Sequence, residues 1–362
     1  MIGKTGMFAL CASLAFALPA RAEDGARGRV PVRVVVVTTF EIGQDTGDTP
    51  GEFQNWVENL PLPNIVPFPQ GYHPLRYNPE KHVLGIVTGE GPSRMASSIT
   101  ALANDPRFDF SHAYWLLAGI AGIDPNVGSV ASAVWAPQVV DGDLAYEIDA
   151  REIPSDWTTG YVPFGRVSPF QPPTPPVATD SGTNAFTLNA GLVEWAYQLS
   201  SGSVQLADDA NLQQLRAQYT DSPAAQRPPA IAKGAVLAAG TFWIGALLNT
   251  WAENWVDYWT SGQGVFTTTA EEDAAYMQAL TFLSQVQAVD LKRVMVLRGA
   301  SNYSVPPPGQ TAAQLLAGEV DATGYSGFIE SLNSTYAAGS AVVNELSGNW
   351  RRYRDTVPSA QP

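Results

Sequence analysis

The chain has 362 residues, of which 45% are hydrophobic and 15% are charged, a composition typical of globular proteins. Its 34 acidic residues outnumber its 20 lysines and arginines, which gives a net charge of -14. This charge argues against binding to nucleic acid or to anionic lipid, because both interactions depend on clustered cationic side chains.

The first residues have the pattern of a secretory signal peptide. One lysine precedes an apolar stretch at residues 7–18, and a small-residue cleavage pattern ends at Ala22. We therefore expect residues 1–22 to be removed and the protein to be periplasmic or secreted. The stretch is shorter than the roughly 20 apolar residues of a membrane span, and we expect no span in the mature chain. The single cysteine lies inside this stretch, so we expect neither a disulfide nor a thiolate metal site in the mature chain.

Strand-like and helix-like patterns alternate along the rest of the chain. The first, residues 32–40, is a run of β-branched residues typical of a strand buried on both faces. Residues 82–105 are predicted to form a strand, a glycine-rich turn and a helix. Further strands are predicted at residues 113–122 (ending in a turn), 130–140, 144–149, 232–245, 264–269 and 293–303. Helices are predicted at residues 52–60, 184–200, 209–220, 247–260, 270–286 and 328–353.

This alternation predicts an α/β fold, a three-layer sandwich with a central mixed β-sheet. A short linker at residues 23–31 leads into a single domain at residues 32–355, and a tail follows at residues 356–362. Residues 150–183 are rich in proline, tryptophan and glycine and are too many for a simple connection. We expect them to form a folded insertion in the domain.

Unusual residues follow several of the predicted strands, where ligands bind in open α/β sheets. The glycine-rich turn TGEGPSR opens a helix, so its backbone N–H groups and Arg94 are suited to an anion. The glycines of AGIAG allow a ligand to approach the backbone, and GTFWIG offers two aromatic rings. Carboxylates in FTTTAEEDAA are suited to binding hydroxyl groups. Each feature also has a structural explanation: a simple turn, a core aromatic, or an acid that stabilises a helix N-terminus.

Taken in order, these segments resemble the purine nucleoside permease family, whose fold is similar to that of the nucleoside phosphorylases and nucleosidases. The resemblance covers residues 32 to about 353. It is carried by TGEGPSRMASS, LLAGIAGIDPNVGSVASAVWA, LAYEIDAREIPSDWTTGY, GTFWIG, TTAEEDAA and RGASN. It implies a purine nucleoside ligand of the inosine, adenosine and guanosine class, and cleavage of its N-glycosidic bond. The alternative is a non-catalytic protein that binds nucleosides for a separate membrane transporter. Members of the superfamily often form homo-oligomers.

The resemblance also implies roles for the residues that would hold the nucleoside. Glu272 would accept hydrogen bonds from the ribose hydroxyls, with Asp273 as the second choice. Asn302 would stabilise the departing purine by hydrogen bonding. The remaining residues implied to lie along the base are Phe242, Trp243, Ala121 and Gly122.

Two nucleophiles remain open. Phosphate would be held by Thr88, Gly89, Ser93 and Arg94. Water would instead be oriented by Glu52, with Glu41 as the alternative. Hexameric phosphorylases of the superfamily carry a phosphate-binding arginine after the first strand, whereas residues 38–56 of this chain hold acids and no arginine. We therefore favour hydrolysis slightly over phosphorolysis and expect no metal and no cofactor, with phosphate as the alternative co-substrate.

Overall fold

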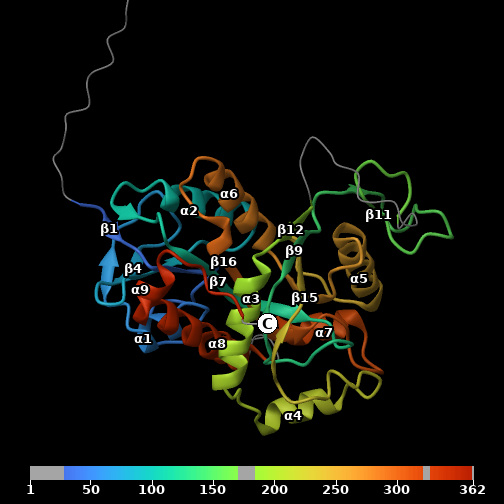
Figure 1. Ribbon diagram of the computed structural model, residues 1–362. Helices are drawn as coiled ribbons and strands as arrows, with labels where there is room; N and C mark the ends of the chain where they lie inside the picture. The colour runs from blue at the N-terminus through green and yellow to red at the C-terminus, as the bar shows by residue number, and fades with distance from the viewer. Residues whose placement is uncertain (1–27, 170–183, 321–326, 361–362) are drawn as a thin grey trace, which may run out of the picture.

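The computed structural model describes residues 28–169, 184–320 and 327–360. The expected signal peptide and residues 170–183 of the expected insertion lie outside these ranges. Figure 1 shows a central sheet with helices on both sides. The mixed α/β fold predicted from the sequence is confirmed.

The main sheet has twelve strands and is mixed. One path through the sheet follows the order β12-β9-β14-β15-β7-β2-β5-β4-β3, in which β15 and β2 pair with different parts of the same edge of β7. On the opposite edge, β7 pairs with β16, which is followed by β8 and β13. The strands are β2 (Val34–Thr38), β3 (Asn64–Val66), β4 (Leu75–Asn78), β5 (Val83–Val87), β7 (Tyr114–Ile123), β8 (Ala133–Trp135), β9 (Gln138–Asp141), β12 (Ala185–Thr187), β13 (Ile231–Lys233), β14 (Ala235–Ala238), β15 (Phe266–Ala270) and β16 (Val294–Tyr303). Two small pairs lie outside it: β1 (Val30–Pro31) with β6 (Phe108–Asp109), and β10 (Tyr146–Glu147) with β11 (Tyr161–Val162).

Helices cover both faces of this sheet. They are α1 (Gln54–Asn59), α2 (Pro92–Ala103), α3 (Ala190–Ser203), α4 (Ala210–Ala217), α5 (Ala246–Thr260), α6 (Asp273–Gln285), α7 (Ala312–Glu319), α8 (Phe328–Gly348) and α9 (Trp350–Tyr353). A short 3-10 turn, Leu291–Arg293, precedes β16. In the part of the chain that the structure describes, no helix combines the length and apolar character needed to cross a membrane.

Side chains that alternate along β16 define the two faces. Arg298 reaches the first residue of α6, whereas Leu297 and Gly299 on either side of it lie against α8. Helices α2 and α6 therefore cover one face, and α8, with α1 and α3 packed on it, covers the other (Figure 1). This is the predicted three-layer arrangement.

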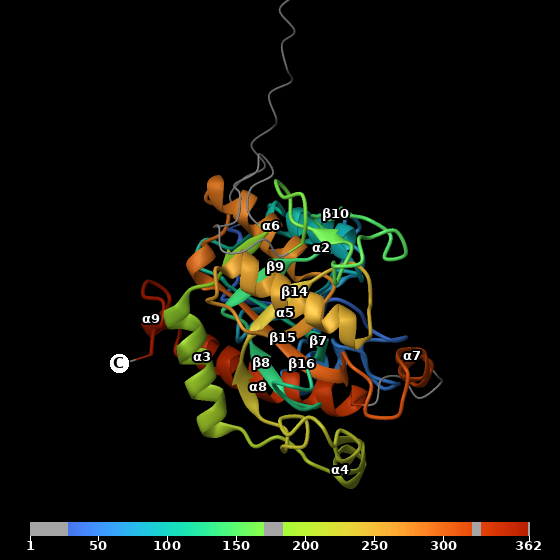
Figure 2. The same cartoon turned by 90° about the vertical axis from the view of Figure 1, so that its right-hand side faces the viewer.

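The sheet has a second apolar core around α5. Along β14, Val236 and Ala238 belong to the main core, while Leu237 faces the opposite side and packs with Trp251 and Trp255 of α5. Figure 2 shows α5 lying across the strands β14 and β15. The tryptophan-rich pattern of residues 247–260 thus forms a helix that buries one aromatic face.

Strand β7 differs from its prediction. The glycines of AGIAG do not form a turn, because β7 continues to Ile123 and pairs with β16 along Trp115–Ile123. On its other edge, β7 pairs first with β2 and then, from Gly122, with β15. Among the described residues, no strand pairs with residues 118–121 on that edge. This gap in the sheet positions the functional site.

Three further predictions of elements are corrected. The single strand expected at residues 130–140 is two strands, β8 and β9, and that expected at 232–245 is β13 and β14. Residues 185–187, expected to be helical, form β12 because they pair antiparallel with β9. The elements that were not predicted as strands or helices are β1, β3, β4, β6, β11 and α7.

Candidate functional site

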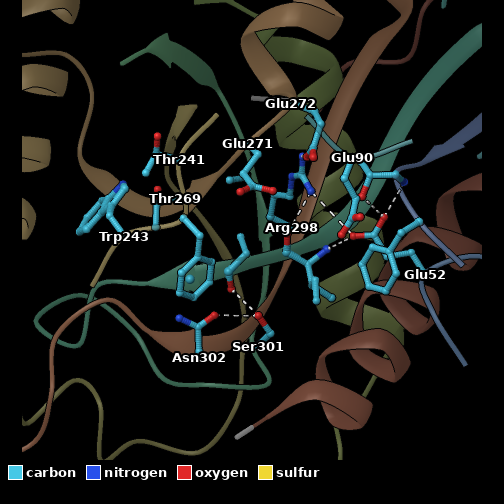
Figure 3. Close-up of a pocket in the computed structure, with 17 residues that line it drawn as sticks. Glu52, Glu90, Thr241, Trp243, Thr269, Glu271, Glu272, Arg298, Ser301 and Asn302 are labelled. Carbon is cyan, nitrogen blue, oxygen red and sulfur yellow. Dashed lines mark hydrogen bonds and ion pairs between the residues drawn. The ribbon is translucent and has the colours of Figure 1, made fainter. Parts of the chain in front are cut away.

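A pocket opens where β2 and β15 diverge along β7. The empty space between its lining residues is about 560 Å³, including its opening to solvent. Figure 3 shows its lining, with carboxylates around Arg298 on one side and Asn302, Ser301 and Trp243 on the other. The pocket thus has a charged end and a largely uncharged end.

Glu52 lies in the wall at the charged end, just before α1. Its Oε2 accepts hydrogen bonds from the backbone N–H (2.6 Å) and hydroxyl (2.8 Å) of Thr39. Its Oε1 accepts one from the N–H of Ile120 (2.7 Å), which the gap between β2 and β15 leaves available. Burial raises the pKa of Glu52 to about 7, although Arg298 opposes the shift. Glu52 is therefore an oriented carboxylate that changes charge near neutral pH.

Arg298, at the centre of the charged end, is fully buried in β16. Its guanidinium donates to both carboxylate oxygens of Asp273 (3.1 and 2.5 Å), to Glu272 (3.2 Å) and to the carbonyl of Ile120 (3.0 Å). No role was predicted for this residue from the sequence. The signal was nevertheless present, because a lone charge in an apolar buried strand requires buried partners.

Glu272 connects this cluster to the start of α2. Its Oε1 accepts a hydrogen bond from the backbone N–H of Gly91 (2.9 Å), the residue that precedes α2. Burial raises the pKa of Glu272, and Arg298 opposes the shift. The helix N-terminus at which the sequence suggested an external anion therefore holds the protein's own carboxylate.

The four residues predicted for phosphate lie outside the pocket wall. Thr88 is buried and donates its hydroxyl to the carbonyl of Thr38 (3.2 Å). Ser93 and Arg94 are exposed, and Arg94 donates to the carbonyl of Glu90 (2.9 Å). The fourth residue, Gly89, has a left-handed backbone conformation and lies next to the side chain of Arg94. The structure does not bring these residues together with Glu52 in one pocket.

Two alternative acids also lie outside the wall. Asp273 is buried behind Glu272, where it pairs with Arg298. Glu41 accepts hydrogen bonds from the backbone N–H groups of Phe53 (2.8 Å) and Gln54 (2.6 Å) at the start of α1. Glu41 thus holds the loop that carries Glu52, and it does not face the pocket.

The uncharged end contains the residues predicted to contact a base. Asn302 lines the pocket, and its side chain accepts from the hydroxyl of Ser301 (3.0 Å) and donates to the carbonyl of Tyr303 (3.2 Å). Ala121 and Gly122 line the same end. A Cβ atom at Gly122 would lie 3.3 Å from Nδ2 of Asn302, so the glycine leaves space beside this amide.

The two aromatic residues of GTFWIG differ in their surroundings. Phe242 lines the pocket and is partly exposed, as a surface that stacks on a ligand requires. Trp243 also lines it, but its ring is mostly buried and packs against Trp251 and Phe266 in the second core. Trp243 is therefore held in the second core, and it supports the part of the pocket wall that Phe242 forms.

Two further carboxylates in the lining, Glu90 and Glu271, have no role predicted from the sequence. Burial raises the pKa of Glu271 to about 7, and the charges of Glu272 and Glu90 add to the shift. Within the described part of the chain, no side chain forms a hydrogen bond or ion pair with either carboxylate. Of the groups in the pocket, these two are the acids that remain unpaired.

The fold of the chain is similar to that of solved nucleosidases. A 5'-methylthioadenosine/S-adenosylhomocysteine nucleosidase from Helicobacter pylori is similar over 88% of this chain and 98% of its own, at 12% identity and a TM-score of 0.50. A mutant of the Helicobacter pylori nucleosidase with 5'-methylthioadenosine in its active site is similar over 86% of this chain and 98% of its own, at 12% identity and a TM-score of 0.50. At this identity the likeness concerns the fold alone.

The chain belongs to the purine nucleoside permease family, whose model matches residues 31–358. A purine nucleoside permease of Candida albicans is 30% identical over 322 residues, covering 88% of this chain and 75% of the relative. A relative from Schizosaccharomyces pombe with the same family name is 30% identical over 284 residues, covering 77% and 80%. The family resemblance predicted from the sequence is confirmed.

Proposed function

We propose that this protein binds a purine nucleoside in the pocket and hydrolyses its N-glycosidic bond. The family and the fold support a nucleoside as the ligand. The observation that carries the hydrolytic part is the Glu52 carboxylate. It is oriented by three hydrogen bonds, is buried in the pocket wall, and has a pKa of about 7. A base with this pKa is suited to activating water at neutral pH.

The pairing of the other groups favours water over phosphate as the nucleophile. The N–H group of Gly91 is bonded to Glu272, and Arg298 is bonded to Glu272 and Asp273. Of the charged residues in the described pocket wall, the only cation is Arg298, and the four others are glutamates. A phosphate dianion would have to displace these carboxylates and be bound beside the remaining ones, at a high electrostatic cost.

In the proposed reaction, Glu52 takes a proton from water as the water oxygen bonds to the anomeric carbon. The bond from that carbon to the purine nitrogen breaks, and its electron pair leaves with the base, which then takes a proton from solvent. Glu272 keeps unused acceptor sites for the ribose hydroxyls. The N–H of Asn302 that is not bonded to Tyr303 stabilises the charge on the base, and the Glu272 carboxylate stabilises the positive charge on the sugar.

The name of the family supports a second function, binding without cleavage. In that case the protein would hold the nucleoside and deliver it to a separate membrane transporter. Export through the N-terminal signal peptide is compatible with both functions and stays part of the proposal.

The substitution Glu52→Gln tests the assignment, with Glu80→Gln, at an exposed glutamate outside the pocket wall, as a matched control. We expect Glu52→Gln to lower the rate of base release from adenosine by about a hundredfold or more, because a general base is lost. Adenosine binding, measured by calorimetry, should change much less. Glu80→Gln should retain most of the activity. Wild-type protein that binds adenosine and releases no base would instead identify a carrier.

A further inference from the structure

Glu90 and Glu271 differ from the other carboxylates of the pocket in having no partner. Glu52 is held by Thr39 and Ile120, and Glu272 by Gly91 and Arg298. Glu90 and Glu271 line the same space, yet within the described residues neither carboxylate forms a hydrogen bond or an ion pair. Above about pH 7, where Glu271 is ionised, their charges therefore act on whatever enters the pocket.

The two glutamates come from different parts of the chain and flank the charged end together. Glu90 follows β5 in the turn that opens α2, and Glu271 lies between β15 and α6. Figure 3 shows both close to Arg298, with Glu271 on the side of Thr269 and Glu90 on the side of Glu52. A ligand that fills the pocket between Glu52 and Asn302 therefore lies beside both of them.

The surrounding charges do not cancel those of the pair. Among the described residues that line the pocket, Arg298 is the only cation, and it is already bonded to Glu272 and to the buried Asp273. Glu271 is half-buried and Glu90 is exposed. When Glu271 is ionised, the two unpaired carboxylates make the potential in the partly enclosed pocket more negative than in solvent. Such a potential opposes the entry of a phosphate group and attracts an ammonium group.

We propose that Glu90 and Glu271 are specificity-determining residues that exclude phosphate-bearing nucleosides from the pocket and favour nucleosides with a cationic substituent. This inference rests on the proposed nucleoside ligand and does not require cleavage. It extends the proposed function because it separates nucleosides from nucleotides by charge. Neither residue is assigned to the chemical step.

Binding to the purified full chain at pH 8, above the pKa of Glu271, tests the proposal with three probes of different charge: adenosine, adenosine 5'-monophosphate and 5'-amino-5'-deoxyadenosine. We expect the monophosphate to bind at least about tenfold more weakly than adenosine, and the amine more tightly. In the double variant Glu90→Gln/Glu271→Gln, the ratio of the dissociation constants of the monophosphate and of adenosine should fall by about tenfold. The advantage of the amine should disappear. The single variants should each give part of the effect and serve if the double variant does not fold.

The control removes two acidic charges elsewhere. Glu80→Gln/Asp257→Asn changes two exposed residues outside the pocket wall and should leave both ratios at their wild-type values. An unchanged ratio in Glu90→Gln/Glu271→Gln would mean that shape rejects the phosphate, and it would overturn the proposal. Equal binding of adenosine and its monophosphate to the wild type would also overturn it. Binding of adenosine without base release would contradict the hydrolytic function alone.

Discussion

Glu52 illustrates how a carboxylate is made basic without losing its orientation. Its hydrogen bonds to Thr39 and Ile120 favour the charged form, whereas burial favours the protonated form, and burial prevails. The pKa of about 7 means that this group exchanges its proton near neutral pH. A surface glutamate, which stays ionised, would be a weaker base.

This pKa gives a prediction for the rate of base release. Because water activation requires the ionised form of Glu52, kcat/KM should fall about tenfold per pH unit below pH 7 and level off above it. A pH profile of adenosine cleavage measures this directly. A rate that is flat, or that rises towards acidic pH, would contradict the role of Glu52 as a base.

The family resemblance was enough to predict part of the site. Glu52, Glu272, Asn302 and Phe242, which the resemblance placed around a nucleoside, line one pocket. The pairing of these groups was not predictable, because it depends on contacts distant in sequence. The bond from Gly91 to Glu272, for example, joins residues 181 positions apart, and it occupies the predicted anion site.

At the scale of elements, the site exists because β7 is longer than its neighbours on one edge. Strand β2 pairs with its first half and β15 with its last two residues, which leaves the N–H and carbonyl of Ile120 for Glu52 and Arg298. Gly119 lies beneath these two side chains. A Cβ atom there would clash with Nη1 of Arg298 and lie 2.6 Å from Oε1 of Glu52.

The substitution Gly119→Ala should therefore disturb the charged cluster. We expect a loss of stability of about 1–3 kcal/mol from overpacking and at least a tenfold loss of base release. Gly202→Ala is the matched control, because no atom lies within 4 Å of its added Cβ in α3. That control should be neutral or slightly stabilising. Urea unfolding and activity assays measure both variants, and unaltered behaviour of Gly119→Ala would contradict this account of the gap.

Most elements followed from hydrophobic periodicity, and two of the exceptions share one cause. The AGIAG segment has the composition of a turn, but β16 pairs with it throughout and keeps it extended. Residues 185–187 precede a helix in sequence, but β9 pairs with them as a strand. In both cases, tertiary pairing overrides local preference.

At the scale of the whole molecule, the ionised form of the buried Glu52 lowers the free energy of unfolding at neutral pH and above. The pKa of Glu52 is raised above its usual value of 4.5, so the folded protein binds this proton more tightly than the unfolded chain does. The stabilisation from this proton is complete below about pH 4.5 and is lost as the pH rises through 7. The pKa of Glu271 is raised in the same direction.

The free energy of unfolding should therefore depend on pH through Glu52. Between pH 8 and pH 5.5 this residue should add about 2 kcal/mol to the stability of the wild type. Glu52→Gln should show a smaller gain on acidification, because its amide does not titrate. Urea unfolding of both proteins at the two pH values makes the comparison, and identical gains would contradict the raised pKa.

The most direct test of the central claim is product analysis of the purified protein with inosine and adenosine, with and without phosphate. We predict free base and ribose in equal amounts, at a rate that phosphate does not change, because the carboxylates occupy the groups that would bind phosphate. Formation of ribose 1-phosphate that requires phosphate would contradict hydrolysis. Binding of nucleoside with no base released would contradict catalysis altogether.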